Sequence, residues 1–462
     1  MMGLLKKNAW RGIALACGLG LAAQQTIAVP DQSDRRDRGP NIIRDAEIEG
    51  LLRVYANPIF AAAGINANAA RVVVIGDPSI NAFVANGQRI FVNSGLITRA
   101  PTPNTVIGVL AHESGHIAGG HLARMNSAMA EASTTAIIGT IFGMAAMVGG
   151  VVAGSSTAAQ AGQGVVIGSQ NTAQRSLLAY SRGMEATADE SAMRYLEATH
   201  QSAKGMLDLF RVLANEALAS TTGADPYAYS HPFPFDRIRT LEATAQASPW
   251  YNKPDDPALV MRHKLAQAKL IGFLQPSLVF QKYPSSDTSM PARYARSIAF
   301  FRKGDLASAM PLIDSLTADQ PQNPYFWELK AQAYLENGKP ALGLPAIARA
   351  RLILPNNGLM QILNAQILLA TESPANADQA ITLLKQARMS ETEEPSIYKF
   401  MAQAYGLKNQ IALAELATAE YAYATGDRGL ASQKASLAKK YLPKGSPEWL
   451  RASDLESFSA KK

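Results

Sequence analysis

The segment AHESGHIAGGH, residues 111–121, constrains this chain most, because it holds three of the six histidines in a pattern that a helix must present. His112, Glu113 and His116 fit H-E-x-x-H. Helix positions four apart share a face, so the two imidazoles can bind one zinc ion. Glu113 lies about 100° round the helix, where it can reach a water on the ion without being a ligand.

His121 is the tempting additional ligand, but a continuous helix would direct it elsewhere. The motif with three histidines requires the third one ten residues after the first, and that position is Leu122. Nine residues at about 100° each place His121 half a turn away from His112. We therefore expect His121 to support the site or pack beside it, and not to bind the metal.

A catalytic zinc needs three protein ligands and a water, so another ligand must come from elsewhere in the chain. The sequence GMEATADE offers Glu185, Asp189 and Glu190. Glu185 and Asp189 share a helical face, where Glu185 can complete a His2Glu site and Asp189 can hydrogen-bond the far nitrogen of a ligating histidine. Glu190 is expected to be solvated. The alternative is a plain acidic helix face, in which carboxylates four apart repel each other slightly.

The N-terminus has the three-part layout of a secretory signal peptide. Three basic residues precede an apolar run at 12–23, and the sequence TIA, residues 26–28, ends in a small residue suited to cleavage. The run is too short to span a bilayer and remain there, with an uncleaved anchor as the alternative. A lipoprotein is disfavoured, because the residues before Cys17 lack the usual leucine.

Cleavage after Ala28 would change both the charge and the cysteine content. It removes the only cysteine, three positive charges and no negative ones, so the formal net charge of +7 becomes +4. The mature chain would carry no disulfide and no exposed thiol, which suits an oxidising compartment such as the periplasm. No dense Lys/Arg block follows, so nucleic-acid binding has no support.

Local patterns before the motif predict a helix and then a hairpin. Apolar residues within 44–65 recur at helical spacing. Two β-branched runs follow, separated by Asn86-Gly87, and an Asn-Gly pair between apolar runs is a strong hairpin signal. From Thr105 to about Arg124 the spacing becomes helical again, and this helix contains the H-E-x-x-H motif.

Residues 132–174 contain no charged side chain, and 134–154 are apolar over a length that could span a bilayer. The remainder is too polar for a second span. A single span would separate His112 and His116 from Glu185, although all three must meet at one ion. We therefore predict no span, and instead a Gly/Ala-rich helical hairpin beside the site that can make peripheral contact with lipid or an outer-membrane partner through 134–154.

The C-terminal third repeats with a period of 34 residues. Ala299, Phe300, Gly304, Ala307 and Pro321 recur as Ala333, Tyr334, Gly338, Ala341 and Pro355. This period with small and aromatic residues at fixed places is typical of tetratricopeptide repeats, whose stacked helix pairs usually hold another chain. The sequence AQAY at 331–334 returns at 402–405, a displacement of 71, so an irregular unit is expected between them. A generic helical bundle is the alternative.

HESGH, then EATAD in a second helix, then SHPFPFDRI, resembles the gluzincin metallopeptidases of the HtpX and CAAX-processing type. The predicted signal peptide and repeat tail are similar to their BepA-like (YfgC) branch of periplasmic protease-chaperones of outer-membrane protein assembly. Specific motifs carry the resemblance over residues 44–245, and the repeats match by type only.

The resemblance implies a role for each matched residue. His112 and His116 would be zinc ligands, Glu113 the catalytic base, Glu185 the third ligand and Asp189 its support. His231 and Arg237 match the H-P-x-x-x-x-R-I element of the family. They are the candidates for a fourth ligand or for stabilising the oxyanion. The upstream hairpin implies a strand that pairs with extended substrate, formed by Arg89, Ile90, Phe91, Val92 and Asn93.

A second hypothesis concerns the imidazole of His231 on its Pro-rich loop. It could occupy the water position on the zinc and hold the enzyme off until a client displaces it. In the alternative, His231 only binds substrate or packs beside the site.

These patterns predict a mainly α fold with a small β-sheet, in which a gluzincin-type metallopeptidase domain precedes an all-α tetratricopeptide-repeat domain. The predicted divisions are a signal peptide at 1–28, a flexible arm at 29–43, the metallopeptidase domain at 44–245, a connecting segment at 246–290, repeats at 291–445 and a tail at 446–462.

Three functions fit these features to different degrees. The first is an exported zinc endopeptidase that cleaves misfolded or stalled outer-membrane proteins, with a repeat domain that holds client or assembly machinery. The second is mainly a chaperone or assembly scaffold with a latent zinc site. The third is a secreted repeat-binding module with an accidental motif, which the joint presence of HESGH, EATAD and SHPFPFDRI disfavours.

Overall fold

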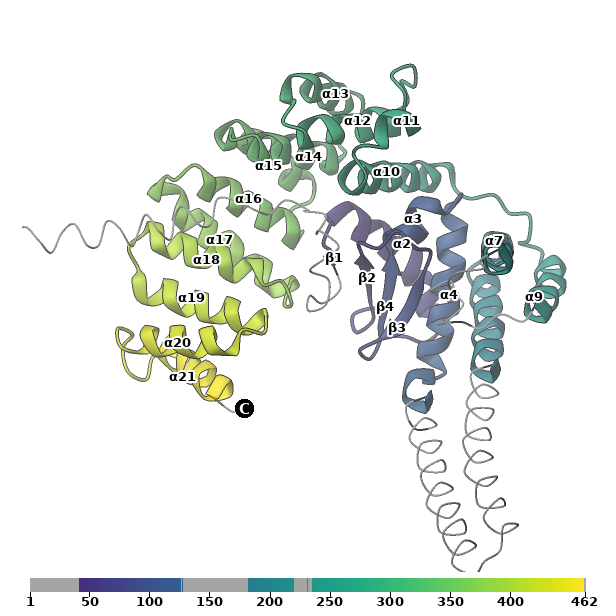
Figure 1. Cartoon of the computed structure of the whole chain (residues 1–462), viewed down its shortest axis with the longest axis horizontal. Coiled ribbons are helices and arrows are strands. Elements are labelled where there is room, and N and C mark those ends of the chain that lie inside the picture. Colours follow the sequence, from purple (N-terminus) through teal and green to yellow (C-terminus); the bar gives the residue numbers. More distant parts are fainter. Residues whose placement is uncertain (1–40, 126, 128–181, 220–230, 232–234, 461–462) are drawn as a thin grey trace, which may run out of the picture.

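The computed structural model describes residues 41–125, 127, 182–219, 231 and 235–460. The predicted leader, residues 29–40 of the predicted arm and the uncharged segment 132–174 all lie outside the described residues. The described chain is mainly helical with one small sheet, as the sequence predicted. Figure 1 shows an N-terminal domain that carries the sheet and, beside it, an arc of paired helices that we call the repeat domain. No helix of the described part is long and apolar enough to cross a membrane.

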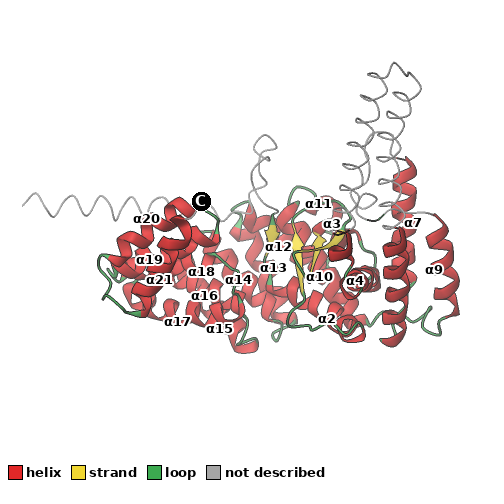
Figure 2. Cartoon of the chain, turned by 90° about the horizontal axis from the view of Figure 1, so that it is seen from below, coloured by secondary structure: helices red, strands yellow, loops and turns green. Residues whose placement is uncertain are grey.

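Four strands form a sheet in the order β1-β2-β4-β3. β1 (Ile42–Ile43) runs antiparallel to β2 (Arg71–Ile75), and β2 runs parallel to β4 (Arg89–Asn93). β3 (Ala82–Ala85) and β4 form the predicted hairpin. Three residues, 86–88, connect the paired Ala85 and Arg89, and Asn86 and Gly87 adopt left-handed φ values of 49° and 85°, which asparagine and glycine tolerate best. Figure 2 shows the strands gathered into one small group among the helices.

The prediction that residues 89–93 form the strand that pairs with substrate is wrong, because this strand lies inside the sheet. β4, formed by Arg89, Ile90, Phe91, Val92 and Asn93, pairs with β2 on one side and with β3 on the other, so both of its edges are occupied. Within the described part of the chain, the outer side of β3 pairs with no strand. Any edge that the sheet offers to a substrate beside the histidines therefore belongs to β3.

Helices cover the sheet on one face and enclose the main core. α2 (Ala46–Ala62) begins at Asp45, whose carboxylate accepts hydrogen bonds from the first-turn amides. α2 buries Leu51, Leu52 and Tyr55 against the sheet and against α4 (Pro103–Ala118). α3 (Ser94–Arg99), a helical segment at 182–198, α7 (Lys204–Ala219) and α9 (Phe235–Ala247) complete this domain.

α10 (Pro257–Leu274) lies inside the predicted connecting segment and joins the two domains. It packs against α2, α3 and α4 on one side and against α12 (Met290–Arg302) on the other, and the short α11 (Val279–Lys282) follows it. Lys269 of α10 is buried, and its Nζ lies 2.7 Å from Asp45 Oδ2 and 3.5 Å from Glu328 Oε2 of the repeat domain. The segment is therefore a packed junction between the domains.

Three carboxylates and a tyrosine surround this lysine. Lys269 Nζ also lies 3.5 Å from Glu47 Oε2, which accepts a 2.7 Å hydrogen bond from the Tyr294 hydroxyl. We call Asp45, Glu47, Lys269, Tyr294 and Glu328 the junction cluster. Burial raises the pKa of Glu328 to about 7, although the charge of Lys269 opposes the rise. Burial likewise raises the pKa of Glu47.

The repeat domain consists of consecutive helix pairs. Its helices are α12, α13 (Leu306–Asp319), α14 (Pro324–Glu336), α15 (Pro340–Ile353), α16 (Gly358–Ala370), α17 (Pro374–Ser390), α18 (Ser396–Leu407), α19 (Ile411–Ala424), α20 (Arg428–Lys439) and α21 (Pro447–Ala460). α12, α14 and α16 start at 34-residue intervals, but α17 has 17 residues where α15 has 14. This longer helix accounts for the irregular unit expected from the displacement of 71.

The turns within these pairs explain why the sequence repeat fades. Gly304 and Gly338, at φ values of 80° and 70°, end the first helix of their pairs. Glu372, 34 residues after Gly338, adopts the same left-handed conformation at φ 55°. The backbone repeat therefore continues where the glycine signature stops.

The segment predicted as a C-terminal tail is part of the repeat domain. Residues 447–460 form α21, which packs against α19 and α20 and buries Ala452 and Leu455. The prediction of a tail at 446–462 is therefore wrong for these residues.

An arginine-glutamate network ties the loop between α17 and α18 to the N-terminal domain. Arg44 Nη2 lies 2.5 Å from Glu391 Oε2, and Arg44 Nη1 lies 3.1 Å from Glu394 Oε2. Arg89 Nη2, at the start of β4, lies 2.5 Å from Glu393 Oε1. The repeat domain thus contacts the N-terminal domain at the junction cluster and again at this network.

Candidate metal centre

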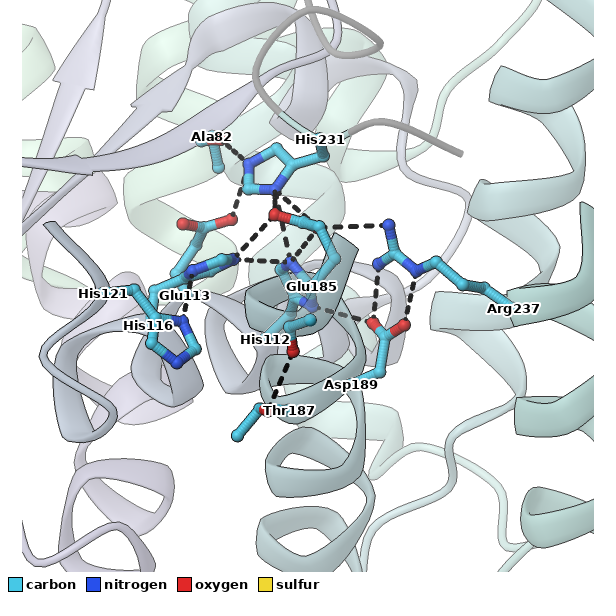
Figure 3. A network of polar contacts seen from close by, with 11 residues as sticks. Ala82, His112, Glu113, His116, His121, Glu185, Thr187, Asp189, His231 and Arg237 are labelled. Carbon is cyan, nitrogen blue, oxygen red and sulfur yellow. Dashed lines mark hydrogen bonds and ion pairs between the residues drawn. The ribbon is translucent and has the colours of Figure 1, made fainter. Parts of the chain in front are cut away.

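Four side chains from three parts of the chain meet beside β3. His112 and His116 lie one turn apart on α4, and Glu185 comes from the helix at 182–198. His231 follows Glu185 by 46 residues in the sequence. Figure 3 shows their ligand atoms converging on one point. One ligand atom from each residue lies within 4.8 Å of the others, and the group is almost wholly buried.

The spacing of these atoms fits a tetrahedral ion. His112 Nε2 lies 3.1 Å from His116 Nε2 and 3.3 Å from His231 Nδ1. Glu185 oxygens lie 3.4 Å from His112 Nε2, 3.3 Å from His116 Nε2 and 3.1 Å from His231 Nδ1. Ligands bound at zinc distances of 2.0–2.1 Å in a tetrahedron are about 3.3 Å apart. The donor set, three imidazole nitrogens and a carboxylate, is also one that zinc prefers.

Asp189 lies behind His112, one helical turn from Glu185. Its Oδ1 lies 2.9 Å from His112 Nδ1, the ring nitrogen that faces away from the other ligands. An Nδ1–H directed at this carboxylate leaves Nε2 with a free lone pair for a metal. Burial lowers the pKa of His112, but its contacts with the carboxylates of Asp189 and Glu185 outweigh this effect and raise the pKa to about 10.

Arg237 of α9 holds both carboxylates of the second helix. Its Nε and Nη2 donate to Asp189 at 2.7 and 2.9 Å, and its Nη1 lies 3.1 Å from Glu185 Oε2. Burial raises the pKa of Asp189, but His112 and Arg237 outweigh it and lower the pKa overall. These contacts support a role for Arg237 in positioning Glu185 and Asp189, rather than contact with a substrate oxyanion.

His121 contacts the site because the helix ends before it, which the calculation for a continuous helix did not include. α4 ends at Ala118, and Gly120 at φ 61° turns the chain before a new helical stretch begins at 121. His121 Nδ1 therefore lies 2.9 Å from His116 Nδ1. The assumption of a continuous helix is wrong, yet His121 contacts the nitrogen of His116 that faces away from the other ligands, which is a supporting position.

Gly115 lets the two ligand-bearing helices approach. A Cβ on Gly115 would lie 2.8 Å from the carbonyl oxygen of Ala188 and 2.9 Å from its Cα, which is closer than real Cβ atoms come. The small residues inside HESGH and EATAD therefore bring Glu185 within reach of the histidines. The sequence contained this signal in Gly115 and Ala188, but the spacing of ligands alone did not reveal it.

Glu113 lies next to the four ligand atoms without joining them. It is fully buried, and its two carboxylate oxygens accept no hydrogen bond from the described residues. Its nearest basic atom is His231 Nε2, 3.4 Å from Oε1. Burial raises the pKa of Glu113, against the charges of His231 and His112. A buried carboxylate of this kind is suited to accept and return a proton.

Residues 44–245 match the model of Peptidase family M48. This match spans the N-terminal domain, and together with the converging His112, His116, Glu185 and His231 it indicates a metallopeptidase domain similar to those of family M48.

Three relatives that match more than half of the chain are named beta-barrel assembly-enhancing protease, one of them as putative. The chain is 23% identical to the beta-barrel assembly-enhancing protease of Yersinia pestis over 86% of this chain and 81% of that one. The protein of the same name in Escherichia coli K12 is 21% identical over 85% and 79% of the two chains. A putative beta-barrel assembly-enhancing protease of Vibrio cholerae is 26% identical over 55% and 51%.

Proposed function

We propose that this chain is an exported zinc endopeptidase of the periplasm that cleaves misfolded or stalled outer-membrane proteins. The observation that carries the proposal is the buried group of His112, His116 and Glu185 beside the buried carboxylate of Glu113, which accepts no hydrogen bond from the described residues. The outer-membrane client is supported by the relatives, which are named beta-barrel assembly-enhancing proteases, and the periplasm is supported by the predicted signal peptide.

His112, His116 and Glu185 would hold the zinc, and Asp189 and His121 would fix the orientation of the two imidazoles. When bound, zinc polarises the scissile carbonyl and lowers the pKa of a water. Glu113 accepts a proton from the attacking water and then returns it to the nitrogen of the leaving amine, so that one water is consumed and one peptide bond is broken.

The edge of β3 that pairs with no described strand is suited to hold the substrate in extended form. Asn93 N donates to Asn81 O at 2.9 Å, and this places residues 81, 83 and 85 in hydrogen-bonded pairs with β4. Ala82 and Val84 therefore direct their amides and carbonyls outward. In agreement, Ala82 O lies 3.2 Å from His231 Nε2. A substrate strand that pairs with Ala82 and Val84 would lie directly beside the ligand group.

The test compares wild type with Glu113→Gln on an unfolded outer-membrane β-barrel protein. Both variants are expected to contain one zinc per chain, and only wild type is expected to produce fragments. Equal cleavage by the two variants, or purified protein without zinc at neutral pH, would refute the proposal. If only wild type produces fragments, the clients that Glu113→Gln traps in the cell envelope would identify the natural substrates.

A second candidate function, a chaperone or assembly scaffold with a latent site, is favoured by the position of His231. Its Nδ1 lies among the ligand atoms, and its Nε2 faces the outward carbonyl of Ala82. His231 thus occupies both the fourth metal position and the start of the substrate edge. If His231 holds the enzyme off, His231→Ala increases cleavage of an unfolded client; unchanged or abolished cleavage would contradict autoinhibition.

A further inference from the structure

The face of the sheet opposite the main core carries an aromatic pair at the β3 edge. Side chains alternate along each strand, and Ala82, Ile90 and Val92 belong to the core that α2 and α4 cover. Phe83 and Phe91 therefore lie on the other face. They stack with ring centroids 5.3 Å apart and an interplanar angle of 15°. Phe91 is buried on the inner strand, whereas Phe83 is partly exposed on the outer one.

The backbone geometry of β3 gives Phe83 a particular relation to a paired substrate. The amide and carbonyl of Phe83 are used by β4, so in an antiparallel complex Phe83 faces a substrate residue in a non-hydrogen-bonded pair. Cα atoms of such pairs are only about 4.5 Å apart, the closest approach that a sheet offers to two side chains. Aromatic rings paired with aromatic or β-branched residues across strands contribute favourably in this position.

We propose that Phe83, supported from behind by Phe91, forms a binding subsite for one large apolar or aromatic side chain of an extended substrate, at the residue directly opposite Phe83. The proposal rests on the proposed function and deepens it by naming a specificity determinant. It links the subsite to the reaction, because the adjacent residue of β3, Ala82, contacts His231 within the ligand group.

This subsite favours substrate segments in which large apolar residues occur at every second position. The substrate residues on either side of the one opposite Phe83 turn toward α4 and the ligand group, where buried charged and polar side chains lie. A segment that alternates large apolar residues with small or polar ones matches both faces. Transmembrane strands of β-barrels have this alternation, whereas a soluble helix with a period of 3.6 residues does not.

The experiment begins with the cleavage sites of the zinc-loaded full chain in a denatured outer-membrane β-barrel protein. When fragments are sequenced and aligned on the scissile bond, we expect large apolar or aromatic residues to be enriched at one fixed position. Two fluorogenic peptides are then made that differ only there, one with phenylalanine and one with alanine.

Wild type is expected to prefer the phenylalanine peptide in kcat/KM, and Phe83→Ala is expected to reduce that preference by up to about fivefold, the upper end of the range of a cross-strand pair. Phe83→Leu should keep most of it. Val84→Ala is the matched control, because its side chain lies on the same strand but on the core face. That variant should retain the preference, whatever it does to the absolute rate.

Two results would overturn the subsite. One is an aligned set of cleavage sites without enrichment at any position. The other is a Phe83→Ala variant that slows both peptides equally, which indicates a purely structural role. A wild type that cleaves nothing would refute the proposed function instead. In that case no cleavage site defines the peptides, and the subsite is decided by fluorescence anisotropy with a labelled peptide from a transmembrane strand of the β-barrel protein and its counterpart with alanine in place of phenylalanine. Wild type must bind the phenylalanine peptide more tightly and Phe83→Ala must not.

Discussion

Replacing Glu328 with glutamine removes one negative charge from the junction cluster that joins the two domains. In the cluster, the buried Lys269 is the single cation facing Asp45, Glu47 and Glu328. Tyr294 of α12 donates a hydrogen bond to Glu47. Glu328 is itself buried, so its ionised form is poorly solvated. The neutral amide of glutamine keeps the shape of the side chain and avoids that cost.

The magnitude follows from the pKa of Glu328, which burial raises from an ordinary value of 4.5 to about 7. A carboxyl with a raised folded pKa favours the folded state at low pH, and this contribution is lost as the pH rises from 4.5 through about 7. That interval corresponds to up to about 3 kcal/mol. Glu328→Gln is therefore expected to match wild type near pH 4.5 and to exceed its stability increasingly up to pH 8.

The assay is urea-induced unfolding of the zinc-loaded chain at a series of pH values, with the free energy of unfolding compared between variants. Glu336→Gln is the matched control: Glu336 ends the same helix, α14, and pairs with Arg302 at the surface of the domain. It should show no gain that grows with pH. A Glu328→Gln variant whose stability differs from wild type by a constant amount, or falls below it at pH 8, would refute the reasoning.

Three further predictions concern the metal centre and the second domain contact. Asp189→Asn should weaken zinc binding about 10- to 100-fold in a chelator competition, because the imidazole of the ligating histidine loses its charged acceptor; unchanged affinity would exclude this role. Gly115→Ala should also weaken zinc binding, since its Cβ must push the Glu185 helix away, whereas Gly406→Ala, with open space around its Cβ, should not. Arg44→Ala should increase amide hydrogen exchange in the loop between α17 and α18, and exchange equal to wild type would show that the network does not hold that loop.

Features set by neighbouring residues could be predicted from the sequence. The four-residue spacing of His112 and His116 determined that both lie on one helix face, and Asn86-Gly87 determined a tight hairpin turn. The 34-residue repeat predicted helix pairs, and it weakened where Glu372 replaced glycine in the turn. These inferences succeed because backbone geometry repeats over a few residues, whatever the rest of the chain does.

Predictions that assumed an unbroken helix, or that depended on which strands pair in the sheet, were less successful. His121 was placed by assuming an unbroken helix, and the left-handed Gly120 broke it. The strand Arg89–Asn93 was recognised as a strand, but its neighbours in the sheet could not be known from its own residues. The segment predicted as a tail forms α21, whose Ala452 and Leu455 are buried against the preceding helices of the repeat domain.

The sequence by itself determined the chemistry of this protein: an H-E-x-x-H helix, an acidic pair four residues apart and a repeating helical tail. Only the tertiary structure decided which atoms meet. It brought Glu185 and His231 to His112 and His116, left one edge of β3 without a partner strand among the described residues and buried Lys269 between the domains. The physical reason is that local spacing fixes the direction of a side chain, whereas contacts between distant segments depend on how whole helices and strands pack. Small residues such as Gly115 contribute to that packing as much as the ligands do.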